Sequence, residues 1–97
     1  MEIQKRGMLT EKIKLRSLEL LGYEIDTTEL RLMPYIIDIM MNDQEIDPDK
    51  INAAERKILK RWRIDGHIVF SDKMWISRKF WDTICELVFL GYVDLQK

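Results

Sequence analysis

The chain has 97 residues, of which 46% are hydrophobic and 34% are charged, and its formal net charge is −1. This length supports one hydrophobic core, so we expect a single compact domain over residues 1–97, with residues 1–9 as the candidate flexible segment. The near-zero net charge excludes a strong long-range attraction of the whole molecule to nucleic acid or to anionic lipid.

The sequence also bears on the compartment. Cys85 is the only cysteine, so it cannot form a disulfide within the chain. Residues 1–7 lack the apolar run of a secretory signal, and the apolar stretch 33–41 is far shorter than the roughly 20 residues that span a membrane. We therefore expect a cytoplasmic protein with no membrane partner.

Two helices are predicted in the first half of the chain. Thr10 is a suitable N-cap and Gly22 suits the left-handed position after a helix, which predicts a helix between them. Asp26 and Glu29 have the spacing of a capping box and predict a second helix that runs to about Asn42.

The second predicted helix is apolar nearly all round. Such a helix must be buried nearly all round, so it is either the central helix of the domain or is covered in part by a second copy of the chain. Pro34 falls on its narrow polar side, where it would cause a modest bend or mark a break between two shorter helices. The candidate protein-interface residues on this helix are Met33, Ile36, Met40 and Met41.

A second capping box, Asn52 with Glu55, predicts a third helix that runs to about Ile64. Its expected inner stripe consists of Ile51, Ala54, Ile58 and Trp62. Its outer face carries five cations, Arg56, Lys57, Lys60, Arg61 and Arg63.

The last third of the chain predicts a small sheet and a fourth helix. Residues 67–70 and 74–76 read as a hairpin, and Ser77 caps the helix that follows. We expect that helix to stop at residues 90–92 and the chain to return as a strand over 92–95 beside the hairpin. The predicted fold is mostly α with a small antiparallel β element, a compact four-helix domain.

Residues that could carry catalysis or bind metal are sparse. His67 has no second histidine or cysteine near it in sequence, and Cys85 falls on the inner side of a helix. The acids of residues 43–49 alternate like a calcium loop, but Pro48 and Ala54 stand where that loop requires Gly and Glu. We expect no enzyme activity, no cofactor, no metal and no small-molecule substrate.

Charge is distributed unevenly along the chain. Residues 23–50 carry eight acids against two bases, whereas residues 51–79 carry eight bases against three acids. Basic side chains can neutralise phosphates without reading sequence. The candidate nucleic-acid-binding residues are Arg56, Lys57, Lys60, Arg61, Arg63, Lys73, Arg78 and Lys79. Trp62 and Trp75 are expected in the core, because each falls on an apolar stripe or strand.

The C-terminal half resembles part of a winged-helix domain, a family that commonly binds DNA. The resemblance is carried by residues 55–59, by Ile68 and Val69, and by residues 77–93. It implies a support helix and a packed helix beside a small sheet. In the family, another helix comes before the recognition helix. This chain has a hairpin at that place instead. The would-be recognition helix also exposes Asp82 and Glu86, which would repel phosphates.

These patterns predict a non-enzymatic binding module, a nucleic-acid-binding regulatory or accessory protein that uses its basic helix. The alternative is a protein-interaction module or adaptor that self-associates as a homodimer, or binds another protein, through the apolar second helix. A domain of this size without an enzyme signature is typical of small bacterial and phage proteins.

Overall fold

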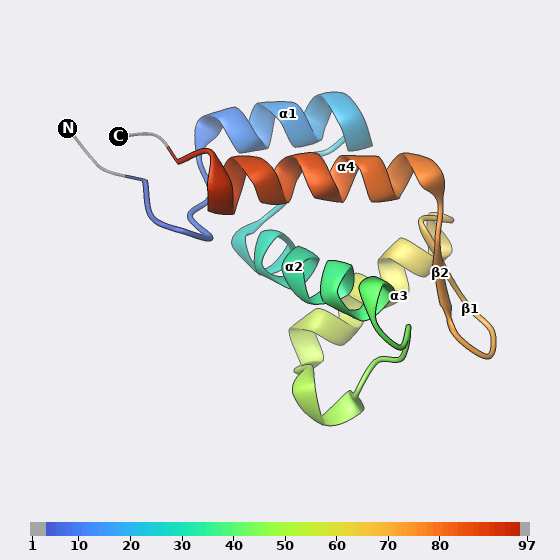
Figure 1. Cartoon of the computed structure of the whole chain (residues 1–97). Helices are drawn as coiled ribbons and strands as arrows, with labels where there is room; N and C mark the ends of the chain where they lie inside the picture. Colours follow the sequence, from blue (N-terminus) through green and yellow to red (C-terminus); the bar gives the residue numbers. More distant parts are fainter. Residues whose placement is uncertain (1–3, 96–97) are drawn as a thin grey trace.

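The structure is a computed structural model that describes residues 4–95. In this part of the chain four helices accompany a two-stranded antiparallel sheet, as the sequence predicts. α1 (Glu11–Leu21) and α4 (Arg78–Val88) lie side by side and run in opposite directions (Figure 1). α2 (Thr27–Met41) packs against α4, and α3 (Ala53–Ile64) packs against α2. No helix within residues 4–95 is both long and apolar enough to cross a membrane.

The helices begin at the capping residues that the sequence predicts. The Asp26 carboxylate accepts the backbone N–H of Glu29 at 2.7 Å, and the Glu29 carboxylate accepts the backbone N–H of Asp26 at 3.4 Å. Asn52 and Glu55 form the same reciprocal pair at the start of α3. Hydroxyl groups cap the other two helices, Thr10 for α1 and Ser77 for α4.

α2 is the central helix of the domain. The helix packs against α3 and α4, and four of its side chains are fully buried, namely Leu30, Leu32, Met33 and Ile36. The helix is continuous from Thr27 to Met41 with Pro34 inside it, so the break that proline could have caused does not occur. The apolar surface of α2 is therefore covered mainly by its own chain, and no second copy is needed to bury it.

The buried stripe of α3 differs from the predicted one. Leu59 and Trp62 are buried, Ile51 and Ile58 are half-buried, and Ala54 is exposed. α3 packs against α2 and β1. The predicted inner face is therefore confirmed for Ile51, Ile58 and Trp62, which lie in or against the core, and is wrong for Ala54.

The hairpin consists of β1 (Ile68–Phe70) and β2 (Met74–Ile76), which pair with Phe70 opposite Met74. The loop after α2 closes the outer edge of β2. The backbone N–H of Met74 donates to the carbonyl of Gln44 at 2.9 Å, and the side-chain amide of Gln44 donates to the carbonyl of Met74 at 3.1 Å. Gln44 is thereby held at a φ of 59°, in the left-handed region. The acidic loop and the hairpin thus form one unit.

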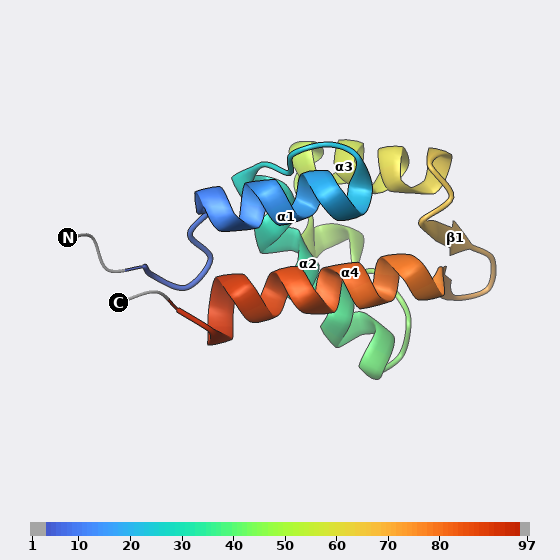
Figure 2. The same cartoon turned by 90° about the horizontal axis from the view of Figure 1, so that it is seen from above.

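The C-terminal segment overturns the predicted helix stop and strand. α4 continues into η2 (Phe89–Val93), a π-helical turn, so Gly91 lies inside helical backbone. A β-carbon at Gly91 would lie 3.3 Å from the side chain of Leu30, so the glycine lets α2 approach this turn closely. No strand forms over 92–95, and this segment lies at the end of the molecule away from the hairpin (Figure 2). Local pattern predicted a stop because it cannot report the distant contact with α2.

The N-terminal segment is held against η2. The backbone N–H of Gly7 donates to the carbonyl of Gly91 at 2.9 Å, and the side-chain amide of Gln4 donates to the carbonyl of Leu90 at 3.0 Å. Gln4 and Gly7, within the segment 1–9, are therefore hydrogen-bonded to η2, and the flexibility of that segment stays a prediction. Residues 1–3 of that prediction lie outside the described residues.

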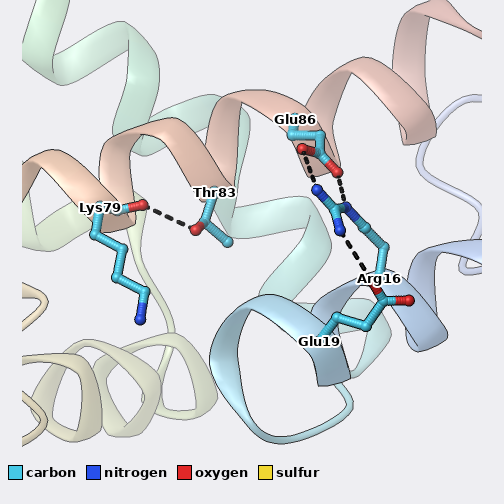
Figure 3. A network of polar contacts seen from close by, with 5 residues as sticks. All are labelled: Arg16, Glu19, Lys79, Thr83 and Glu86. Carbon is cyan, nitrogen blue, oxygen red and sulfur yellow. Dashed lines mark hydrogen bonds and ion pairs between the residues drawn. The ribbon is translucent and has the colours of Figure 1, made fainter.

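Ion pairs occupy the outer face of α4. Figure 3 shows Arg16 of α1 between Glu86 of α4 and Glu19 of its own helix. Arg16 Nη2 donates to Glu86 Oε1 at 3.1 Å, its Nε also donates to Glu86, and its Nη1 donates to Glu19 at 2.9 Å. The hydrogen bond from Arg16 lowers the pKa of Glu86. The acids of α4 thus face α1 and solvent, with Asp82 lying 3.8 Å from Arg78.

Candidate binding surface

The five cations of α3 are all exposed, but they do not form one row. At about 100° per residue, positions 56, 60 and 63 share one line along the helix, and positions 57 and 61 share another. The structure places Arg56, Lys60 and Arg63 around one hollow. We call these three residues the cation line.

In the second pair of cations, Lys57 and Arg61, the arginine contacts the loop between α1 and α2. The guanidinium of Arg61 lies 4.1 Å from the centre of the Tyr23 ring, and its Nε lies 4.0 Å from a carboxylate oxygen of Asp65. A cation over an aromatic ring is stabilising. Arg61 therefore has contacts within the fold, and Lys57 is the freer member of this pair.

A groove of about 380 Å³ runs beside the cation line. α3 contributes Leu59 and the three cations to its lining, and β1 contributes Phe70. The loop that leads to α3 forms a wall of the groove, contributing Ile46, Pro48 and Ile51. Arg56 Nη2 donates to the carbonyl of Pro48 at 2.9 Å, which ties this wall to α3.

The three predicted cations outside α3 have other surroundings. Lys73 Nζ donates to the carbonyl of Asp43 at 3.3 Å and joins the hairpin turn to the acidic loop. Arg78 pairs with Asp82 along α4. Lys79 lies near His67, whose pKa is lowered mainly by burial and further by the charge of Lys79. None of these three lines the groove.

The two tryptophans that the sequence places in the core behave differently. Trp62 is fully buried, with its ring centre 5.0 Å from that of Phe80, as predicted. Trp75 is 56% exposed and lies opposite Val69 on the outer face of the hairpin. Alternation puts these two on the face that no helix covers, while Ile68 and Met74 point inward. The core prediction for Trp75 is therefore wrong.

Only part of the predicted protein interface on α2 is accessible. Met33 and Ile36 are fully buried inside the single chain, so they cannot contact a second molecule while the fold is intact. Met40 is half-buried, and Met41 at the end of the helix is 74% exposed. Only these two remain available for such a contact.

Residues with catalytic chemistry lie apart from one another. The His67 ring stacks on Phe80 with 4.3 Å between ring centres. Cys85 is half-buried, and burial, together with the charge of Asp82, raises the pKa of its thiol. Within residues 4–95, no three His, Cys, Asp or Glu side chains are grouped in a way that could hold a metal ion.

Sequence reasoning found the cation line but missed the groove beside it. Ile46 and Pro48 fall in a predicted loop and Phe70 in a predicted strand, and nothing in their spacing indicates that the loop folds back onto α3. The bond from Arg56 to Pro48, eight residues earlier, has no sequence signature. Neither a protein-family model, a curated protein nor a solved structure matches this chain.

Proposed function

We propose that this protein is a non-enzymatic nucleic-acid-binding module that contacts phosphates through the basic face of α3. The observation that carries the proposal is the exposure of all five α3 cations. Among the described residues, only Arg61 of the five has a carboxylate within ion-pair distance. The other four cations are available to an anionic partner. When such cations bind phosphates, counterions are released from the nucleic acid, and this release favours binding.

The proposal uses the winged-helix resemblance only in part. A basic helix beside a small hairpin is retained, but α3 rather than α4 is the contact helix. Glu86 on α4 is engaged by Arg16, and Asp82 would face any phosphate that approached. The net charge of −1 limits attraction to the region of α3, so affinity should depend strongly on salt.

The test is binding of a fluorescently labelled oligonucleotide, measured by anisotropy in about 50 and 200 mM salt. We expect binding at low salt that weakens steeply at high salt. Reversing three charges on α3 (Lys57→Glu, Lys60→Glu, Arg63→Glu) should abolish it. The matched control reverses three exposed cations elsewhere, Lys5, Arg6 and Lys12, which changes the net charge equally.

Two outcomes would reject the proposal. One is the absence of binding in about 50 mM salt by a protein that circular dichroism shows to be folded. The other is equal loss of binding in the α3 variant and in the control variant, which would assign any attraction to overall charge. Arg56 and Arg61 are left unchanged because each has a contact that holds the fold.

A further inference from the structure

The groove beside the cation line has two chemically different parts. Its inner surface is apolar, formed by Ile46, Pro48, Ile51, Leu59 and Phe70. Its charged part consists of the three cations along one side of α3. A fitting ligand must therefore combine a flat or compact apolar group with a repeated negative charge.

We propose that the groove holds an unpaired nucleobase of a single-stranded nucleic acid, with Phe70 as the stacking surface and the cation line on the adjoining phosphates. This inference rests on the proposed nucleic-acid function and specifies its ligand. Proteins that bind single strands combine a basic groove with aromatic side chains on which bases stack. Phe70 is 41% exposed, and it is the one aromatic side chain among the residues that line the groove.

The dimensions agree with this ligand. Arg56 and Arg63 are seven residue steps apart and so span about 10 Å of helix, at roughly 1.5 Å per step. One strand of a stacked helix carries a phosphate about every 3.4 Å, so the cation line can face about three of them. The groove volume of about 380 Å³ lies within the roughly 300–1,000 Å³ typical of ligand pockets and leaves room for a base with its sugar.

A duplex fits this site poorly. A helix that reads duplex DNA must protrude into the major groove, whereas this side of α3 lies in a hollow bounded by the loop and by Phe70. Bases in a duplex also have their faces covered, and exposing one costs energy. The groove lining includes no hydroxyl, amide or carboxylate side chain that would recognise a 2′-hydroxyl, so a DNA strand is an adequate probe.

The acidic loop restricts the path of the strand. Its carboxylates border the loop wall and would repel phosphates, although Asp47 already accepts the backbone N–H of Asp49 at 3.0 Å. The strand must therefore run on the α3 side of the groove. Arg56, fixed by its bond to Pro48, defines one end of that path.

The experiment compares a labelled oligodeoxythymidine with a duplex of equal length by anisotropy at low salt. We expect the parent protein to bind the single strand more tightly than the duplex. Phe70→Ala should weaken single-strand binding about 5- to 150-fold, the range for loss of one base stack, and leave duplex binding nearly unchanged. Phe70→Trp should retain single-strand binding. Val69→Ala, next in sequence but on the outer face, is the matched control and should have no effect.

The outcomes separate this inference from the function on which it rests. Absence of all nucleic-acid binding would reject both. Salt-dependent binding in which the duplex equals or exceeds the single strand, or in which folded Phe70→Ala binds the single strand as the parent does, would overturn only the base-stacking site. A synthetic peptide of alternating Glu and Leu that binds more tightly than the oligonucleotide, in a manner that requires Phe70, would also overturn it. That result would assign the groove to an acidic protein segment.

Discussion

The hydroxyl of Tyr23 donates a hydrogen bond of 3.1 Å to the carboxylate of Glu29, a side chain that is only 4% exposed. Burial raises the pKa of Glu29 above its ordinary value of 4.5. Burial, assisted by the charge of Glu29, also raises the pKa of Tyr23 to about 12. Glu29 belongs to the α2 capping box, so helix initiation and a buried ionisable group depend on the same side chain.

We expect Glu29→Gln to remove a pH dependence from folding. Because the folded-state pKa is raised, the stability that this group contributes is complete below its unfolded pKa and is lost as the pH rises through its folded pKa. The unfolding free energy of the variant minus that of the parent protein should therefore increase as the pH rises. One proton limits this shift to about 1.4 kcal/mol per pH unit. Urea titrations followed by tryptophan fluorescence, between about pH 4 and pH 7, measure it.

Glu86→Gln is the control with the opposite sign. Arg16 lowers the pKa of Glu86, so this contribution is present above the unfolded pKa and is lost as the pH falls through the folded pKa. Glu29 and Glu86 are each replaced by glutamine, so the two variants introduce the same amide side chain. A difference between Glu29→Gln and the parent that stays constant with pH would contradict the assignment.

Gly91→Val should lower the unfolding free energy by about 1–3 kcal/mol, because added carbon atoms would press on the buried side chain of Leu30. Chemical denaturation measures the loss. Val93→Ala, at an exposed position in the same turn, should change stability by less than about 0.5 kcal/mol. Combining Gly91→Val with Leu30→Val should cost less than the sum of the two single changes, since the second makes room for the first. Strict additivity would show that the two residues are not in contact.

Neighbouring hairpin residues should respond very differently to truncation. Met74 is buried, so Met74→Ala should cost about 2–5 kcal/mol in unfolding free energy. Trp75 faces solvent opposite Val69, and Trp75→Ala should cost about 0.2–1 kcal/mol, the range for one cross-strand pair. Thermal or urea unfolding of the two variants measures both losses. A larger loss for Trp75→Ala than for Met74→Ala would mean that the hairpin register is shifted by one residue.

Light scattering at micromolar concentration should give the mass of a single chain, 11.7 kDa. The apolar side of α2 is already covered by α3 and α4, so no second copy is required to bury it. A mass twice as large, restored to that of one chain by Met41→Glu, would support the alternative of self-association through the end of α2.

The sequence was informative wherever structure depends on near neighbours. Each of the four helices begins at a capping residue that bonds to a backbone N–H three positions later. The hairpin follows from its turn between two apolar runs. The burial of α2 follows from its composition. The five α3 cations are outward because the helix has one polar side.

The errors arose where distant segments meet. Gly91 reads as a helix stop, yet Leu30, sixty-one residues earlier, packs at the position where a side chain would be. Trp75 reads as core because it falls on an apolar strand, yet the structure pairs it with Val69 on the exposed face of the two-stranded sheet. The groove requires the loop from residue 46 to fold back on α3, which no local pattern encodes.

The bonds from Gly7 to Gly91 and from Gln4 to Leu90 bring the beginning and the end of the fold together. The hairpin, which contributes Phe70 to the groove, lies at the far end from these contacts (Figure 1). A short flexible linker between the first and last residues that the structure describes, 4 and 95, could therefore close the fold into a circle with little strain. Cyclisation would restrict the unfolded ensemble and raise thermal stability, while the groove would keep its access to large ligands. The same geometry would allow the domain to be inserted into a surface loop of another protein without separating that loop's ends.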